Sequence, residues 1–380
     1  MSKRKKKTED PIIAGADSKN YSIHTLTFRA RLTKRDRNSI KEKLIEFSEK
    51  KKAGYFKKKS KGKVTYKTIN YNVASDFGFN MVSLLTITAE NSDTYYWMDI
   101  KVNPRWMFHR DNHPFVYIAN KEELVACYER IIRFLKETEI KEIDENAFYI
   151  QRADYCVNID LGDREHVKVF MRLMRKGAHP YKSKRRMEYS NTGKREVSTR
   201  NSFTVYTDGF EFSVYDKQIQ LCGEMEKYSE EEIKEAEGII RIELRVKRRK
   251  IRYDGKKRGY DDTLQFLSHA GDIAKENIPK YLKMAYGSGR FVKLKEAKQT
   301  VRASGYKNKT KEKMIKILDR VSRKNLQDVK ESYGKEFSMY MKRFNDLGIS
   351  PITIEKRSRI DEFPGVSHLI EYKNRNYGLK

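Results

Sequence analysis

The sequence predicts an α+β protein, with a central antiparallel sheet that has helices on one side and a smaller helical C-terminal domain. Segments with the two-residue alternation of strands recur up to about residue 250, and the pattern is helical from about 261 to 345. Hydrophobic residues make up 38% of the 380 residues and aromatic residues 12%, which is enough for a folded core. We therefore expect a disordered basic arm at 1–18, a first domain at 19–255 and a second domain at 256–380.

The first half of the chain alternates strand and helix patterns. Strand patterns occupy residues 21–32, 64–72, 80–88, 95–102 and 147–161. Helix patterns occupy residues 36–52, 121–139 and 165–176. The clearest is 121–139, where apolar side chains recur at helical spacing at Leu124, Tyr128, Ile131 and Leu135.

The second half begins with a predicted hairpin. Strand patterns at 201–206 and 210–218 flank Thr207-Asp208-Gly209, and Asp-Gly is a strong turn signal. A capping box of Ser229 and Glu232 predicts a helix at 228–237, and residues 239–247 form the next strand pattern. The best helix patterns of the C-terminal region are 310–321 and 327–347.

Charge is the dominant feature of the composition. The chain has 82 Lys and Arg against 53 Asp and Glu, a formal charge of +29, and nine of the fourteen residues from Arg245 to Arg258 are basic. Such clusters favour a polyanionic partner, with nucleic acid ahead of an acidic membrane surface. The sequence has no apolar run long enough to cross a membrane, no signal-peptide pattern, and three separated cysteines, so we expect a cytoplasmic protein.

Three predicted strands carry polar side chains on one face. Because strand side chains alternate, the strand at 147–161 presents Asp154, Cys156, Asn158 and Asp160 together. The strand at 239–247 likewise presents Arg241, Glu243 and Arg245, and the strand at 210–218 presents Tyr215 and Lys217. Oxygen ligands on adjacent strands suit Mg²⁺ or Mn²⁺. Cross-strand ion pairs on a half-solvated sheet give the same pattern, and spacing alone favours this second interpretation.

The order of these motifs resembles the replication initiation factor family of rolling-circle plasmids and, more loosely, replication proteins of filamentous phages and integrative elements. The likeness covers about residues 95 to 250. It consists of Asn103-Pro104 at the end of a strand, Arg152-Ala153-Asp154, Tyr215-Asp216-Lys217, and Arg241-Ile242-Glu243 through Lys247. The family lacks the His-x-His motif of other rolling-circle nucleases, and so does this chain. The resemblance implies a sheet domain shaped like the HUH nucleases.

The resemblance also implies roles for single residues. Tyr215 would be the nicking nucleophile, with Lys217 or a metal stabilising its phenolate. Asp154 and Glu243 would bind Mg²⁺ or Mn²⁺. The family tends to have a second acid where this chain has Asn158, and Asp160 is the candidate to replace it. Basic residues near the motifs are expected to bind DNA, namely Arg152, Arg241, Arg245, Lys247, Arg248, Arg249, Lys184 and Arg185.

The function that the resemblance implies is the initiation of rolling-circle DNA replication. The protein would nick one strand of a double-stranded origin, hold the 5′ phosphate on tyrosine, and later rejoin the strand. A host helicase and a host polymerase would be partners, and the resemblance suggests a homodimer. We expect the helical region after about residue 260 to recognise the duplex origin. Two alternatives stay open, a nicking relaxase of an integrative element and a non-catalytic basic DNA-binding protein.

Overall fold

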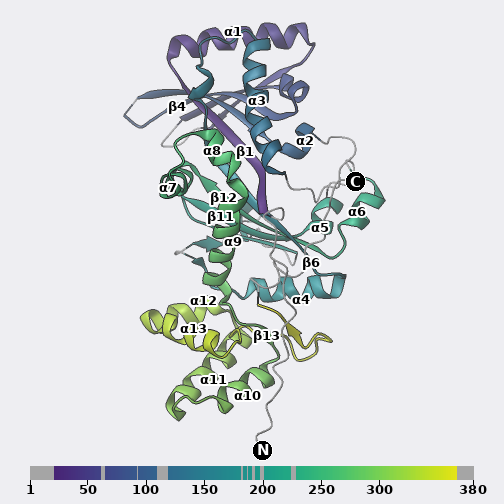
Figure 1. Ribbon diagram of the computed structural model, residues 1–380, viewed down its shortest axis with the longest axis vertical. Helices are drawn as coiled ribbons and strands as arrows, with labels where there is room; N and C mark the ends of the chain where they lie inside the picture. The colour runs from purple at the N-terminus through teal and green to yellow at the C-terminus, as the bar shows by residue number, and fades with distance from the viewer. Residues whose placement is uncertain are drawn as a thin grey trace, which may run out of the picture.

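The computed structural model describes residues 21–60, 65–91, 93–108, 119–180, 183–185, 187–190, 193–196, 201–223 and 228–365. The arm expected at 1–18 lies outside these residues. Figure 1 shows an elongated molecule, with the sheet in its upper and middle part and a group of helices at its lower end. The predicted fold class, an antiparallel sheet followed by a helical region, is confirmed.

The main sheet has ten described strands, and every neighbouring pair in it is antiparallel. Their order is β2-β3-β4-β5-β1-β6-β12-β11-β10-β7. The strands are β1 (Tyr21–Leu32), β2 (Tyr55–Ser60), β3 (Thr65–Tyr71), β4 (Phe79–Thr88), β5 (Thr94–Val102), β6 (Tyr149–Asp160), β7 (Lys184–Arg185), β10 (Ser202–Tyr206), β11 (Phe210–Asp216) and β12 (Ile239–Lys247). Two small sheets pair β8 (Met187–Ser190) with β9 (Gly193–Glu196) and β13 (Phe291–Val292) with β14 (Glu362–Phe363).

One face of the sheet is apolar and is covered by helices. These are α1 (Lys34–Lys50), α3 (Lys121–Glu137), α4 (Arg164–Arg175), α7 (Arg248–Arg258), α8 (Thr263–Ser268) and α9 (Ala270–Tyr286). Helix α9 runs along this face (Figure 1), and its Tyr281 ring lies 4.8 Å from the Phe210 ring. Burial of these side chains is the main stabilising term of the fold.

The opposite face is largely free of helices in the described chain. The exceptions are the short helices α5 (Lys217–Cys222) and α6 (Glu230–Glu235). Helix α2 (Pro104–Phe108) follows β5 and packs against α3. Leu221 and Ala236 pack with Ile239 in a small separate apolar cluster at one end of β12. The remaining length of this face is available to polar side chains.

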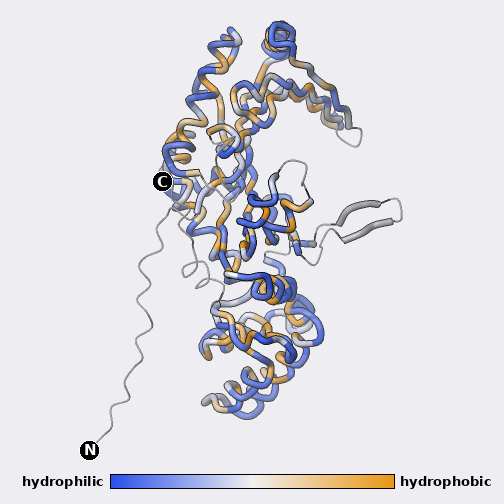
Figure 2. The backbone as a smooth tube through the Cα atoms, turned by 90° about the vertical axis from the view of Figure 1, so that its right-hand side faces the viewer, coloured by the Kyte–Doolittle hydropathy of each residue, from blue (hydrophilic) through white to orange (hydrophobic). Residues whose placement is uncertain are grey.

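The helices at the lower end are α10 (Leu294–Ala303), α11 (Asn308–Arg323), α12 (Leu326–Tyr333) and α13 (Phe337–Asp346). Figure 2 shows hydrophilic and hydrophobic stretches alternating along them, as expected for helices that each bury one face. The Leu326 amide donates to the Lys176 carbonyl at 2.8 Å, which ties α12 to the end of α4. No helix among the described residues is long and apolar enough to cross a membrane.

The structure differs from the sequence interpretation at two places that affect the site. The expected domain boundary at 255/256 falls inside α7, and α9 packs on β1 and β6, so the helices up to Tyr286 share the core of the sheet. The strand expected to reach 218 ends at Asp216. The Asp216 carboxylate accepts from the Ile219 amide at 3.2 Å and caps α5, so Lys217 is the first residue of a helix.

Candidate active site

Polar side chains on the open face of the sheet form three rows across β11, β12 and β6. The strand register places Tyr215 beside Arg241 and Asn158, Ser213 beside Glu243 and Cys156, and Glu211 beside Arg245 and Asp154. Each row lies two residues from the next along a strand, so all of these side chains point to the same face. We call this group of nine residues the polar face.

Tyr215 and Glu243 are in direct contact. The Tyr215 hydroxyl donates a hydrogen bond to Glu243 Oε1 at 2.5 Å. Burial raises the pKa of Tyr215 well above its usual 10, and the negative charge of Glu243 adds to this effect. The phenol is therefore protonated at neutral pH, and a carboxylate oxygen lies in position to receive its proton.

Arg241 lies beneath this pair with no exposed surface. Its Nε donates to Asn158 Oδ1 at 2.8 Å. Burial acts to lower the pKa of Arg241, but the charges of Tyr215, Cys156 and Glu243 outweigh it, and the pKa is raised. A permanent positive charge thus lies next to Tyr215, where it favours a phenolate. Asn158, the departure from the family pattern, orients this guanidinium.

Asp154 is the centre of an ion-pair network. It is buried, with 1% of its surface exposed, and Arg152 binds both of its oxygens, with Nε donating to Oδ1 at 2.7 Å. Arg245 Nε approaches it to 3.3 Å, while Arg245 Nη1 donates to Glu211 at 2.5 Å. Two guanidiniums therefore occupy the carboxylate that the sequence indicated as a metal ligand.

The structure does not bring Asp160 to the same place. Six residues along one strand separate Asp160 from Asp154, a span of about 20 Å at ~3.3 Å per residue. Asp160 Oδ1 instead accepts from the Gly162 amide at 2.8 Å and holds the turn after β6. Asp154 and Asp160 were expected on the same face of the strand, but they are too far apart along it to bind the same metal ion.

Lys217 has a different setting from the one expected. It does not continue the strand of Tyr215, and its ammonium donates to Gln220 Oε1 at 2.7 Å inside α5. Only 4% of the Lys217 surface is exposed. Its positive charge acts to lower the pKa of His24 and of Cys156. Burial raises the pKa of Cys156 to about 12, so this thiol is not a competing nucleophile at neutral pH.

His24 is a member of the site that sequence reasoning missed. The register between β1 and β6 shifts between Ile23 and Thr25, and this bulge turns His24 toward the polar face. Its Nδ1 lies 3.9 Å from Glu243 Oε1. Burial, and then the charges of Arg241 and Lys217, lower the pKa of His24 well below 6.5, so the ring is neutral at pH 7. Alternation over 21–32 gives no signal of a bulge.

The residues present suit a metal ion held by few protein ligands. Among the described residues, no group of three or more His, Cys, Asp or Glu side chains could hold a metal ion. Glu243 and neutral His24 form a pair, and Mg²⁺ commonly uses one or two carboxylates together with waters and substrate phosphate. Glu243 and His24 therefore suit a metal site whose remaining ligands are waters and the DNA phosphate.

The remaining predicted residues lie around this centre. Lys247 is exposed at the end of β12, Arg248 and Arg249 begin α7, and Lys184 is exposed on the edge strand β7. The side chain of Arg185 lies outside what the structure describes. Of the rival tyrosines, Tyr155 is fully buried on the helix-covered face and Tyr206 is 38% exposed on β10.

Comparison with known families identifies the chain. A phage family described as the N-terminal part of a replication-associated protein matches residues 44–269, more than half of the sequence, including β6, β11 and β12. The chain belongs to this family. Membership confirms the predicted role of this replication-associated protein in initiating rolling-circle replication by nicking DNA.

Two further comparisons concern single proteins. A solved structure described as a rolling-circle replication initiator protein from Geobacillus stearothermophilus is similar at 11% identity over 69% of this chain and 85% of that one, with a TM-score of 0.33. No curated protein matches. His24 and the helices after 269 lie outside the segment that the family matches.

Proposed function

We propose that this replication-associated protein nicks origin DNA with Tyr215 as the nucleophile and a divalent metal ion at Glu243. The observation that carries the proposal is the hydrogen bond from the Tyr215 hydroxyl to Glu243 beside the buried Arg241. A tyrosine with a raised pKa needs a proton acceptor and a positive charge to attack phosphorus, and both are adjacent.

The reaction balances with the groups on the polar face. The Tyr215 oxygen attacks the scissile phosphorus, and its proton passes to Glu243 Oε1. The bond from phosphorus to the 3′ oxygen breaks, and that oxygen takes a proton from water to give the free 3′ hydroxyl. Arg241 stabilises the phenolate character that develops on Tyr215. Rejoining reverses these steps, and the bond energy is kept in the phosphotyrosine.

A divalent ion, when bound, neutralises charge on the scissile phosphate. Glu243 and His24 are the residues that would hold it. Asp154 would join them only after releasing Arg152, because both of its oxygens accept from that guanidinium. We propose that DNA phosphate draws Arg152 and Arg245 away, so that the second carboxylate becomes available when DNA is bound.

The test is incubation with the supercoiled replicon in Mg²⁺ or Mn²⁺, followed by mapping of the peptide that carries DNA. Wild-type protein should give open circles with protein attached at Tyr215. Tyr215→Phe should give no adduct, with nicking reduced by about 10⁴-fold or more, the scale seen when a covalent nucleophile is lost. Tyr206→Phe is the matched control and should nick normally. An adduct on Tyr206, Tyr155 or a serine would refute the assignment.

A further inference from the structure

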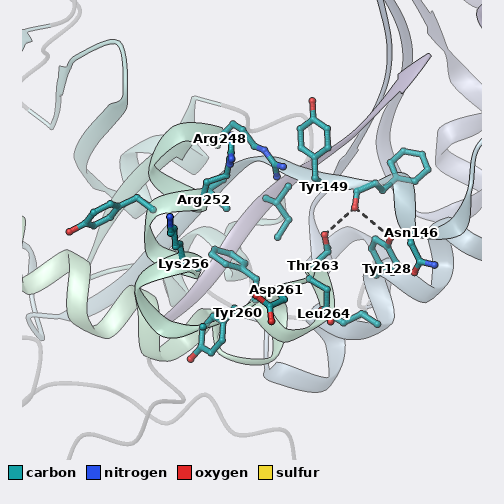
Figure 3. Close-up of a pocket in the computed structure, with 18 of the residues that line it drawn as sticks. Tyr128, Asn146, Tyr149, Arg248, Arg252, Lys256, Tyr260, Asp261, Thr263 and Leu264 are labelled. Carbon is teal, nitrogen blue, oxygen red and sulfur yellow. Dashed lines mark hydrogen bonds between the residues drawn. The ribbon is translucent and has the colours of Figure 1, made fainter. Parts of the chain in front are cut away.

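A wide groove lies between α7 and α8, at the end of the sheet where β6 begins. Its volume is 1210 Å³, larger than the roughly 300–1,000 Å³ of a pocket for one small ligand. Figure 3 shows Arg248, Arg252 and Lys256 along α7 on one side, and Thr263 and Leu264 on the other. Buried Ile251 and Phe266 form part of an apolar floor.

Six of the seven cations of α7 divide into two groups, and the seventh, Arg249, also lines the groove. On the sides away from the groove, Lys250 pairs with Asp254, and Lys257 and Arg258 pair with Glu276. Arg248, Arg252 and Lys256 line the groove at four-residue spacing, and in the described chain none of these three has an ion-pair partner. Like charges at this spacing repel each other along a helix, so the row is unfavourable until an anion joins it.

Aromatic rings accompany this row. The Arg248 guanidinium stacks 3.7 Å from the centre of the Tyr149 ring, and Tyr253 is 63% exposed at the groove. Asp261 and Asp262 line the groove as well, so its α8 side repels phosphate and can accept hydrogen bonds from base amino groups. Phosphates on one wall, bases over an apolar and aromatic floor, and acceptors opposite match a single nucleic acid strand.

The groove and the active site lie on the same strand, β6, which begins at Tyr149 in the groove and carries Asn158 near its other end. The charges of Arg29, Arg31 and Asp99, on the open face of the sheet, affect the pKa of Tyr149. Along β6, Tyr149 lies nine residues from Asn158, the neighbour of Arg241, or about 30 Å at ~3.3 Å per residue. Arg152 and Arg245 lie between these two points.

We propose that the α7–α8 groove holds a segment of single-stranded DNA at a distance from the nick, with its phosphates along Arg248, Arg252 and Lys256. This inference rests on the proposed function for the identity of the ligand. It adds a second binding site, which keeps the strand engaged while Tyr215 acts at the other end of β6.

The test measures binding of a fluorescein-labelled single-stranded oligonucleotide of mixed sequence in EDTA, so that no cleavage occurs. The double variant Arg252→Ala/Lys256→Ala should bind about tenfold more weakly, and the slope of log K against log salt should become shallower by about 1.4, for two lost phosphate contacts. The control Lys257→Ala/Lys283→Ala removes the same charge from positions outside the groove and should change affinity by less than about twofold.

A second variant tests the aromatic part of the groove. Tyr253 is exposed, so Tyr253→Ala should fold, and it should weaken binding by about tenfold through lost base stacking. If the groove variant and the control variant lost the same affinity for the oligonucleotide, the proposal would be overturned, because net charge alone would then explain binding. A larger loss for duplex than for single strand would overturn it too. Adduct formation by the wild-type preparation reports separately on the proposed nicking function.

Discussion

Replacing Asp154 with asparagine removes the negative charge at the centre of the polar face and leaves a side chain of nearly the same size and shape. Asparagine keeps one oxygen acceptor but removes the negative charge that Arg152 and Arg245 share. Those guanidiniums are 29% and 28% exposed, so water already screens part of the attraction. We expect the free energy of unfolding to fall by about 1–3 kcal/mol, because the three charge-assisted hydrogen bonds to Asp154 weaken or are lost.

The same change should strengthen DNA binding. Two guanidiniums that no longer face a carboxylate can each bind a phosphate, so affinity for single-stranded DNA should rise by about tenfold. The slope of log K against log salt should steepen by up to about 1.4. Nicking should nevertheless fail if Asp154 joins the metal ligands when DNA is bound.

Fluorescence anisotropy over a salt series, thermal unfolding and adduct formation together measure these effects. Asp160→Asn is the matched control, because it makes the same chemical change on the same strand about 20 Å away and should leave binding and nicking unaltered. An Asp154→Asn protein with wild-type affinity and salt slope would show that the arginines do not meet phosphate. Nicking at the wild-type rate would remove Asp154 from the chemistry.

Glu243→Gln should abolish the adduct while DNA binding persists, whereas Glu211→Gln, one row away on the same face, should still form the adduct. Equal loss in both variants would mean that the face acts only through its charge. Because the pKa of His24 is lowered, we expect Mn²⁺ affinity, measured by calorimetry, to fall by less than about twofold between pH 8 and pH 6, where a histidine of ordinary pKa would lose about fourfold. A fourfold loss would show that His24 titrates normally. Gly289→Ala should destabilise the protein by about 3 kcal/mol, because its Cβ would lie 2.2 Å from the Ile349 carbonyl carbon, and Gly305→Ala, with nothing within 4 Å, should be silent in thermal unfolding.

Local patterns in the sequence were sufficient to predict most of the fold. Alternation located β1, β4, β6 and β12 to within a few residues, because each strand has an apolar face against helices and a more polar opposite face. The end of β11 was missed, because a side-chain cap at Asp216 overrode the alternation. The expected boundary at 255/256 falls inside α7, because a change in local pattern does not reveal that α9 packs back onto β1 and β6.

For the candidate site, the sequence predicted which side chains lie on the same face of the sheet, but not which of them lie close together. Alternation assigned Tyr215, Glu243 and Asp154 to one side of the sheet, and the register then placed them in neighbouring rows. Alternation says nothing of separation along a strand, which is why Asp160 was a poor candidate. His24 depends on a bulge, and the groove depends on the packing of α7 against α8, so neither follows from periodicity.

Lys57 and Lys58 have a consequence beyond their charge. They lie on β2, the edge strand of the main sheet, where unpaired backbone groups invite another chain to add a strand. Lys57 and Lys58 are exposed there, and their ammonium groups lie 5.8 Å from the Tyr55 ring and 5.3 Å from the Phe56 ring. Cations over exposed aromatic rings discourage that pairing by repelling an identical edge. The charges on this edge therefore oppose the addition of a strand from a second copy of the chain at β2.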